Sequence, residues 1–481
     1  MKKQVVTRYA PSPTGYMHVG NLRTALYSYL TARKNGGKFI LRIEDTDQAR
    51  FVADATKIII DTLHTAGLKY DEGPDIGGPN GPYTQSERKA IYMQYAQDLV
   101  DQGKAYYCFC QKRNADEDCE AIVVDPCADL PLEEAKKKVA EGASFTIRHR
   151  VKKTGTTTFV DNVFGEITVQ NDTLHDIILI KSDGMPTYNF AHIIDDHLMG
   201  VTHVLRGSEF ITSTPQFIQL HNDLGFEVPQ FYHLPLIMGK NEAGEVSKLS
   251  KRHGAVAFSD LVALGYLPQA IINYISLLGW HPADTDQEIF SLSELEQVFD
   301  TANIRKSAAI FDYDKLKWVN SQYILKMTPA EFKEYAMPYI RNTLTRDVFD
   351  VDKLCEILQP RVQIFSEIAE KIEFFQDLVD FDINLLFNPK KKTDEQNSKE
   401  ILSLTLQKLQ SVELSDWHND VLYQQLEDIC VQTGLKPVSV MWVVRIALSG
   451  QTVTVGGATE IMQILGKSET MIRLQTTLNR L

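Results

Sequence analysis

The sequence predicts an α/β fold that is interrupted by an inserted segment and followed by an all-helical region. Residues 1–107 alternate strand and helix patterns as a parallel sheet does, and this alternation returns at 182–255. Between these two halves, at 108–181, short strands rich in Val and Thr take over. From 326 to 481 amphipathic helices follow one another with hardly a strand.

The first βα unit carries an anion-binding loop. A strand is expected at 4–7 and a helix at about 21–33, where apolar residues recur at helical spacing until Gly36 and Gly37 stop it. The loop between them is rich in Pro and Gly and places His18 and Gly20 at the mouth of the helix. Free backbone N–H groups and the positive end of the helix favour an anion there, and the imidazole can hydrogen-bond a phosphate.

The following elements are predicted in the same way. A buried strand at 38–43 leads into an acidic segment at 44–47, and a helix with Ile58, Ile59, Ile60 and Leu63 on its apolar face comes next. Strands of the insertion are expected at 144–148 and 156–160, and 176–181 leads back to βα units.

A helical junction is expected at 256–325, where Ala270, Ile271, Tyr274 and Leu277 share one face. The polar, lysine-rich stretch 388–398 is interpreted as a solvated loop between helices.

A second phosphate-binding segment lies far downstream, at Lys248-Leu-Ser-Lys-Arg252. Two lysines on a short loop flanked by Gly and Ser can bind phosphates as mobile point charges. Each segment alone is a weak signal, but the two in this order indicate an enzyme that acts on the α-phosphate of ATP.

Composition sets limits on the function. The chain has 481 residues, 43% of them hydrophobic, which suffices for several buried cores. No run of about 18 apolar residues and no signal peptide is present, so a cytoplasmic protein without a membrane contact is expected. The net charge of −13 argues mildly against a nucleic-acid partner, although a local basic surface can bind a polyanion on an acidic protein.

Four of the six cysteines fall in one short window, namely Cys108, Cys110, Cys119 and Cys127. In a reducing compartment such a cluster favours a metal over disulfides, and this spacing suits a tetrahedral zinc site. The alternative is a lost site with leftover thiols.

The two phosphate-binding segments resemble the two signature motifs of class I aminoacyl-tRNA synthetases. Further segments resemble the bacterial glutamyl-tRNA synthetases over essentially the whole chain: Arg8-Tyr-Ala-Pro-Ser-Pro-Thr-Gly15, Leu41-Arg-Ile-Glu-Asp-Thr-Asp47, Pro186-Thr-Tyr-Asn-Phe190, Asp195-Asp-His197, Leu205-Arg-Gly-Ser-Glu209, Lys251-Arg-His-Gly254, Gly265-Tyr-Leu-Pro268 and Ala447-Leu-Ser-Gly450.

The resemblance implies a Rossmann-type class I synthetase catalytic domain, with an inserted α+β domain for the tRNA acceptor stem and an all-α anticodon-binding domain. It implies that a glutamate carboxylate attacks ATP, that glutamyl-adenylate and pyrophosphate form, and that the 3′ end of tRNA(Glu) then displaces AMP. Whether tRNA(Gln) is also charged stays open. The expected partners are tRNA, ATP and L-glutamate, and the expected state is a monomer.

The resemblance also implies the roles of single residues. His18, Lys248 and Lys251 are the expected catalytic residues, and together with Gly20 and Glu209 they bind ATP. The expected glutamate-binding residues are Arg8, Ala10, Ser12, Glu44, Tyr188, His192 and Arg206. Arginine suits this task because its planar fork binds a carboxylate at two points. Mg²⁺ is expected to accompany ATP.

For zinc, the resemblance adds Cys127 and Asp129 to Cys108 and Cys110, and Cys119 is an alternative fourth ligand. Asp129 departs from the histidine that is more usual in the family.

Four other functions are disfavoured. A nucleotidyltransferase and a truncated tRNA-modifying relative would both lack the helical C-terminal region. A glutaminyl enzyme would carry β-barrels there. A non-catalytic tRNA-binding relative is disfavoured because His18, Lys251, Arg8, Glu44 and Arg206 are all present.

Overall fold

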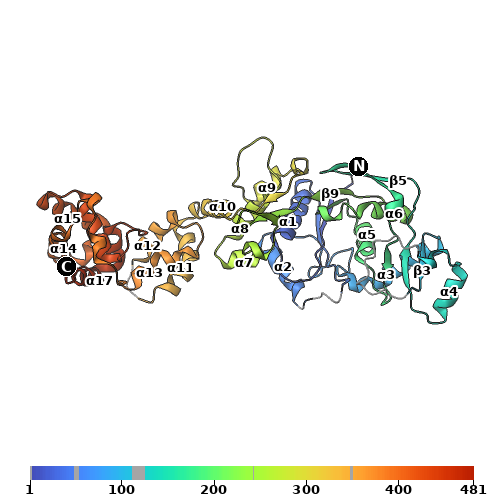
Figure 1. The fold of residues 1–481 in the computed structure, drawn as a ribbon, viewed down its shortest axis with the longest axis horizontal. Coiled ribbons are helices and arrows are strands. Elements are labelled where there is room, and N and C mark those ends of the chain that lie inside the picture. The colour runs from blue at the N-terminus through green and yellow to red at the C-terminus, as the bar shows by residue number, and fades with distance from the viewer. Residues whose placement is uncertain (1–2, 48–51, 53, 111–124, 242, 347–349) are drawn as a thin grey trace. The chain divides into compact units, whose positions relative to one another are not determined.

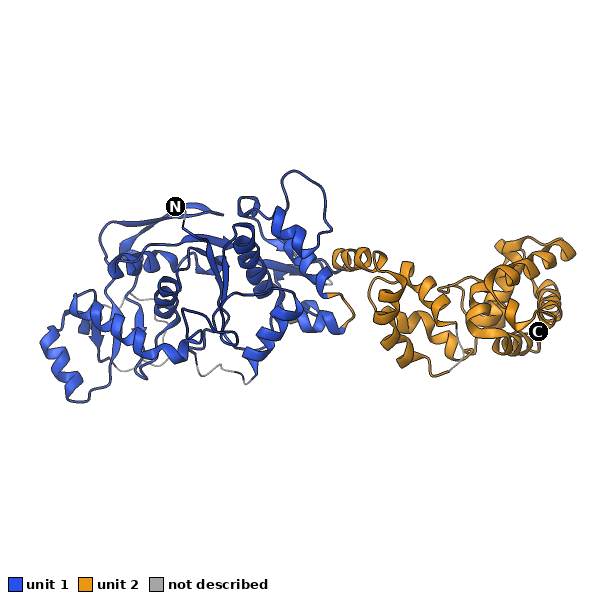
Figure 2. Ribbon diagram, turned by 180° about the vertical axis from the view of Figure 1, so that it is seen from behind, with its two compact units in different colours: residues 1–263, 268–313 blue, residues 264–267, 314–481 orange. Residues whose placement is uncertain are grey.

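The computed structural model describes residues 3–47, 52, 54–110, 125–241, 243–346 and 350–481, except for the side chain of Lys251. The chain divides into two compact units, which Figure 2 shows in separate colours. Unit 1 comprises 1–263 and 268–313, and unit 2 comprises 264–267 and 314–481. The finer division into five segments that the sequence predicts stays a prediction.

Unit 1 begins with the predicted βα unit. Strand β1 (Val6–Tyr9) pairs in parallel with β2 (Lys38–Leu41), and helix α1 (Val19–Lys34) connects them. Strand β1 therefore begins two residues later than predicted, whereas the buried face of α1 is as predicted. The chain reverses at Gly36, which has φ +59°, and at Gly37, where a Cβ would lie 2.1 Å from the carbonyl oxygen of Val5. A larger residue at Gly37 would clash, so this turn depends on glycine.

The second half of the parallel arrangement is built on β8 (His203–Gly207) and β9 (Gln230–Leu234), which pair in parallel. Strand β8 lies beside β1, because the amide of Thr202 donates to the carbonyl oxygen of Val6 (2.9 Å). The predicted inserted segment supplies two further strands to this sheet, β5 (Thr156–Asp161) and β6 (Gly165–Gln170), which gives the order β6-β5-β9-β8. Part of the insertion is thus continuous with the sheet that contains β8 and β9.

The rest of the insertion forms a separate antiparallel sheet of β3 (Ala105–Cys108), β4 (Thr146–His149) and β7 (Ile178–Ile180). Its core is shared with residues of α3 (Lys89–Asp101), α5 (Tyr188–Leu198) and α6 (Thr214–Leu224). Figure 1 shows α5 and α6 between β9 and this smaller sheet, with α4 (Leu132–Ala140) at the far end. The segment predicted at 176–181 is a strand over three residues only.

The remaining elements of unit 1 are mostly helical, as predicted, apart from one small sheet in the order β11-β10-β12. The helices are α2 (Ala55–Thr65), α7 (Phe258–Ala263), α8 (Pro268–Ser276) and α9 (Leu292–Val298). The strands are β10 (Ile237–Lys240), β11 (Val246–Lys248) and β12 (Ala309–Ile310). The short 3-10 turns are η2 (Gln85–Arg88), η3 (Pro126–Asp129), η4 (Asn171–Thr173), η5 (Ser208–Phe210), η6 (Lys251–His253) and η7 (Thr301–Asn303).

The described part of unit 2 is all-helical, as the sequence predicted. Its α-helices are α10 (Tyr313–Leu325), α11 (Pro329–Thr343), α12 (Val351–Leu358), α13 (Glu367–Gln376), α14 (Glu395–Gln410), α15 (Asn419–Thr433), α16 (Pro437–Ser449) and α17 (Ala458–Leu478). Its 3-10 turns are η8 (Gln359–Arg361), η9 (Ile383–Leu386), η10 (Pro389–Lys391) and η11 (Leu414–Asp416).

Two segments of unit 2 are irregular, namely the predicted loop at 388–398 and the middle of α17. The loop predicted at 388–398 is wrong in part, because η10 lies in it and α14 begins at Glu395, where Asp394 caps the helix. Helix α17 is kinked at Gly466, whose φ of 74° interrupts the helical backbone. Across the described residues, no helix has both the length and the apolar character needed to cross a bilayer.

Candidate functional site

The carboxyl ends of β1 and β2 carry buried charged residues that meet on α5. Arg8, in β1, donates from Nε to both oxygens of Asp196 (3.1 and 3.3 Å). Arg42, which follows β2, donates to the same carboxylate from Nη1 (2.7 Å). Burial would raise the pKa of Asp196, but Arg8 and Arg42 outweigh it and hold that pKa well below its usual range. Asp196 is therefore an ionised anchor for both arginines.

Glu44 lies in the same network. Its Oε1 accepts from Nη2 of Arg42 (2.8 Å) and, more weakly, from Gln85 (3.4 Å). In the described part of the chain, every hydrogen bond to Glu44 reaches Oε1, so Oε2 is available to another donor. Burial raises the pKa of Glu44, while Arg42 and Arg8 act in the opposite direction. A cationic group placed at Oε2 would complete this site.

Arg206, at the end of β8, has a different environment. Its Nε donates to Nε2 of His233 (3.0 Å), and its Nη2 donates to the hydroxyl of Thr214 (2.8 Å). Three aromatic rings, those of Phe210, Phe217 and Phe231, surround its guanidinium at 5.1–5.2 Å from their centroids.

Arg206 is 4% exposed, and its Nη1 has no well-aligned hydrogen-bond acceptor among the described residues, although the Tyr188 hydroxyl interacts with the Arg206 side chain. A buried guanidinium N–H without an acceptor is costly, so an anionic ligand would stabilise this arrangement.

Tyr188 and His192 form one wall of the site, on the first turns of α5. Their rings stack at 4.7 Å between centroids, and Tyr188 also packs on Phe210 (5.2 Å). The Nδ1–H of His192 donates to the carbonyl oxygen of Tyr188 (2.7 Å). Burial, with the nearby Arg206, holds the pKa of His192 well below its ordinary value, so the imidazole is neutral. The ring of His192 thus packs against the ring of Tyr188 and supports it. Because Nδ1 is bonded to the backbone, only Nε2 of His192 could accept a hydrogen bond from a ligand.

The predicted phosphate-binding residues converge at the first turn of α1. The Nδ1 of His18 accepts from the amide of Gly20 (3.3 Å), so in the neutral ring the proton is on Nε2, which can donate to a phosphate oxygen. The amide of Val19 donates to the carbonyl oxygen of Val256, which ties this turn to the segment after the two lysines (2.9 Å). Burial and the charge of Lys248 lower the pKa of His18. Two segments that are far apart in sequence are therefore brought together.

Other predicted residues are placed as follows. Lys248 is exposed at the end of β11, and Lys251 begins η6, with its side chain outside the described part. Ser12 is exposed, and Ala10 is half-buried beyond the end of β1. Glu209 is exposed on η5 and folds back on its own chain, since a Cβ on Gly207 would lie 2.0 Å from its Oε2.

The cysteine cluster forms a compact group at the start of the insertion. Ligand atoms of Cys108, Cys110, Cys127 and Asp125 all lie within 4.8 Å of one another. The Sγ atoms of Cys110 and Cys127 are 3.8 Å apart. Tetrahedral ligands at about 2.3 Å from zinc are about 3.8 Å apart, so the group fits that metal.

The fourth member of this group is Asp125, which the sequence analysis did not single out. It caps η3 by accepting from the amide of Cys127 (2.9 Å), and it pairs with Arg148 (3.2 Å). The predicted Asp129 is the last residue of η3 and does not belong to the group, so its role stays a prediction. Cys119 lies outside the described residues.

Sequence reasoning also missed four residues that hydrogen-bond to the predicted site residues Arg8, Glu44 and Arg206. These are Arg42, Asp196, Thr214 and His233. Asp196 and Arg42 lie in segments that the sequence analysis quoted, but no role was assigned to them.

In unit 2, Trp442 on α16 has Arg445 over its ring (5.2 Å) and Lys391 somewhat farther away (5.9 Å). Aromatic rings and cations together can bind the bases and phosphates of single-stranded nucleotides.

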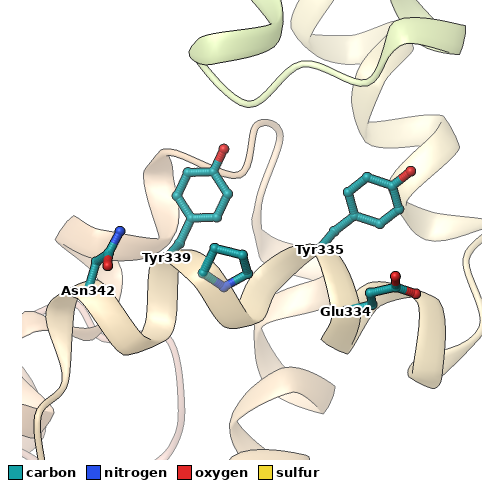
Figure 3. A pocket seen from close by; sticks show the side chains of 5 residues that line it. Glu334, Tyr335, Tyr339 and Asn342 are labelled. Carbon is teal, nitrogen blue, oxygen red and sulfur yellow. The ribbon is translucent and has the colours of Figure 1, made fainter. Parts of the chain in front are cut away.

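Unit 2 also has a surface cavity of about 620 Å³ on α11. Figure 3 shows the phenol rings of Tyr335 and Tyr339 on the same side of that helix. Both rings stack on Phe365 (5.5 and 6.0 Å), and none of the predicted site residues lines the cavity.

Comparisons with known proteins cover almost the whole chain. Residues 4–318 match the family model described as tRNA synthetases class I (E and Q), catalytic domain, and residues 331–478 match an anticodon binding domain. A glutamate--tRNA ligase of Clostridium novyi is 48% identical over 490 residues, which cover 100% of this chain and 98% of that protein. One from Clostridium acetobutylicum is 47% identical and covers 99% of each.

Solved structures of glutamate tRNA ligases are also similar to this chain. The crystal structure of a glutamate tRNA ligase from Elizabethkingia meningosepticum, in complex with its amino acid, superposes with a TM-score of 0.89 at 32% identity and covers 99% of both chains. A glutamate-tRNA synthetase from Elizabethkingia anophelis gives the same TM-score and identity.

Proposed function

Because this chain belongs to the class I tRNA synthetases for glutamate and glutamine, we propose that the residues described above carry out the ATP-dependent ligation of glutamate to tRNA. The enzyme is a glutamate--tRNA ligase that forms glutamyl-adenylate, releases pyrophosphate and transfers glutamate to the 3′ end of tRNA(Glu). The observation that carries the choice of amino acid is the buried, incompletely bonded guanidinium of Arg206.

Selection of glutamate needs a cation for its side-chain carboxylate and an anion for its amino group. Arg206 supplies the cation, and its Nη1 can donate to a carboxylate oxygen. Glu44 supplies the anion through Oε2. Arg8, already paired with Asp196, contributes positive charge near the end of β1, where Ala10 and Ser12 offer backbone and hydroxyl groups. Tyr188, on its His192 support, limits the size of the bound side chain.

Activation of glutamate is mainly a matter of position and charge, because no covalent protein nucleophile is required. His18 donates from Nε2 to the phosphates of ATP, beside the amide of Gly20. Lys248 and Lys251 bind the phosphates as negative charge shifts towards pyrophosphate. Glu209 lies near the nucleotide. Class I synthetases use ATP with Mg²⁺, which neutralises phosphate charge when it is bound.

We also propose one structural zinc ion, held by Cys108, Cys110 and Cys127 and completed by Asp125 or Asp129. When bound, the metal would fix β3 and η3 to each other and so make this part of the insertion rigid.

For the tRNA, we propose that the insertion binds the acceptor stem and that unit 2 binds the anticodon. The match of residues 331–478 to an anticodon binding domain and the cation-flanked Trp442 support the second assignment. The enzyme acts as a monomer in the cytoplasm, where its tRNA is found. Charging of tRNA(Gln) in addition to tRNA(Glu) is left to experiment.

The test is a charging assay with purified tRNA(Glu) and tRNA(Gln) and with labelled glutamate, glutamine and aspartate. Charging of tRNA(Glu) with glutamate alone is expected. Charging with glutamine at a comparable kcat/KM would contradict the assignment of Arg206, because a neutral amide gains little from a free guanidinium.

A further inference from the structure

Arg206 is connected to two further buried residues. His233, on β9, accepts the Nε–H of Arg206 at Nε2 (3.0 Å) and donates from Nδ1 to Oδ2 of Asp161 (2.7 Å). Asp161 is the last residue of β5. The three residues lie on the adjacent strands β8, β9 and β5, and the side chains of His233 and Asp161 are fully buried. A chain of hydrogen bonds therefore leads from the predicted insertion to the predicted glutamate site.

The geometry fixes the tautomer of His233. A carboxylate can only accept, so Nδ1 must carry the proton, and Nε2 is left as an acceptor that faces Arg206. Asp161 is itself held by three backbone amides, those of Val163 (3.0 Å), Phe164 (2.8 Å) and His233 (3.1 Å). Burial lowers the pKa of His233 more than Asp161 raises it, so the ring is neutral. The direction of each hydrogen bond in the chain is thus determined by Asp161.

Because the imidazole of His233 is neutral, it does not offset the positive charge of Arg206. Arg8 is equally buried but is paired with the carboxylate of Asp196. Arg206 forms no ion pair with any described residue, because its partners are an imidazole and the hydroxyls of Thr214 and Tyr188. Its positive charge is therefore not neutralised by the protein, while its rotamer is held at Nε and Nη2. A carboxylate in place of His233 would hold the rotamer equally well but would compete with the substrate.

We propose that Asp161 and His233 are positioning residues that orient Arg206 towards the substrate carboxylate without neutralising it. This inference rests on the proposed function. It assigns a role in amino-acid selection to β5, a strand of the segment that was predicted to be a separate acceptor-stem domain.

Two replacements of His233 distinguish the hydrogen bond at Nε2 of its ring from the hydrogen bond at Nδ1. In His233→Gln the amide oxygen can take the place of Nε2 and accept from Arg206. In His233→Asn the amide can reach Asp161 but not Arg206. We expect His233→Asn to raise the KM for glutamate about tenfold or more, with the KM for ATP within about twofold of wild type, and His233→Gln to restore most of the loss. A residue that only stabilises the fold would not distinguish the two amides in this way.

Asp161→Asn tests the far end of the chain. The side-chain amide of an Asn at position 161 would place an N–H group against the backbone amides or against Nδ1 of His233. The proton of His233 would then no longer be fixed on Nδ1, and its Nε2 would no longer be held as an acceptor for Arg206. We expect a raised KM for glutamate with little change for ATP, and a lower melting temperature. This variant also keeps the test decisive if His233→Asn does not fold.

The matched control is His149, whose Nε2 lies 2.8 Å from Oδ2 of Asp223 and which is also fully buried in unit 1. His149→Asn should lower the melting temperature without changing the KM for glutamate.

The outcomes separate this inference from the proposed function. If Arg206→Ala impairs glutamate use but His233→Asn and Asp161→Asn do not, the positioning role is wrong and the function stands. If His233→Asn and His233→Gln have equal effects, or if both KM values rise together, the positioning role is also overturned. If Arg206→Ala itself has no effect on glutamate use, the proposed site fails first.

Discussion

The Nη1 atom of Arg42 donates to the carboxylate of Asp196 across 2.7 Å, with both side chains buried in unit 1. The same carboxylate binds Arg8. Two arginines from successive strands of the sheet are therefore held by one acidic residue of α5, and the predicted amino-acid site is built on this ion cluster.

Replacing Asp196 with Asn should destabilise the protein strongly. Arg8 would lose its carboxylate, and Arg42 would lose one of its carboxylate partners while keeping Glu44. Removal of one partner from a buried ion pair typically costs about 3–5 kcal/mol. Denaturant unfolding, followed by a signal from unit 1, measures the loss. The control is Glu227→Gln, which breaks the exposed Lys3–Glu227 pair and should leave stability unchanged. Equal effects of the two changes would show that the buried cluster is not a stability determinant.

Replacing Arg206 with Ala should raise the KM for glutamate strongly, by about a hundredfold, because the substrate carboxylate would lose a charged, preoriented partner. The KM for ATP should change little. ATP–pyrophosphate exchange at varied glutamate concentration measures both constants. Arg206→Lys keeps the charge but not the fork, so it should recover only part of the loss. Unaltered glutamate use would place the amino-acid site elsewhere.

His18 has two functions that one pair of variants can separate. His18→Asn keeps an acceptor for the amide of Gly20 but has no group at the place of Nε2, whereas His18→Ala loses both. If the donor at Nε2 stabilises the transition state, both variants should lower the activation rate about a hundredfold, and only His18→Ala should also weaken α1. Full activity in His18→Asn would contradict a catalytic role.

Lys251→Ala should reduce pyrophosphate exchange by orders of magnitude with little change in the KM for glutamate, as expected for a residue that binds only phosphates. Arg252→Ala, its exposed neighbour, is the comparison. Similar losses in the two variants would argue against a specific role for Lys251.

Two single changes test the two aspartates as the fourth zinc ligand. Protein purified without chelator should contain about one zinc per chain, and Cys108→Ser should lose it. Asp125→Asn should weaken zinc retention against a chelator if Asp125 is the ligand, as its position among the three cysteines suggests. In that case Asp129→Asn should retain the metal. The reverse pattern would assign Asp129, and metal-free wild-type protein would refute the site.

Stability should fall as the pH is lowered from about 6.5 to 4. Burial lowers the pKa of His221 from 6.5 to about 4. Within this window the unfolded chain binds a proton that the folded chain does not, so unfolding becomes more favourable, by up to about 3 kcal/mol. Buried His192 and His233 shift in the same direction. Melting temperatures at pH 7.5 and 5.0 test this, and His221→Leu should lose less stability on acidification than wild type. A flat profile would contradict the prediction.

Much of the fold could be predicted because its signals are local. The apolar spacing in α1 and the two glycines after it suffice for the first βα unit. The all-helical character of unit 2 follows from repeated amphipathic patterns. The loop predicted at 388–398 was wrong in part because polar residues at a helix start, such as Asp394, resemble a loop in composition.

The site was predicted less completely, for reasons of geometry. The sequence named Arg8 and Arg206 as candidates, but their different environments depend on partners in α5 and β9 that no spacing reveals. Asp125 was missed because its position beside the thiols follows from the turn that it caps, not from a metal-ligand pattern. Asp161 was missed because its partner lies across a sheet that joins distant segments.

The continuity of β5 and β6 with β8 and β9 limits how this enzyme can be re-engineered. An exchange of residues 108–181 for the matching segment of a relative would replace not only the proposed acceptor-stem surface but also two strands of the sheet that carries Arg206. Such a chimaera would place position 161, the proposed support of His233, on a strand taken from another protein. A graft that is meant to alter only tRNA docking should therefore keep β5 and β6 native and exchange only the segment between β3 and β4.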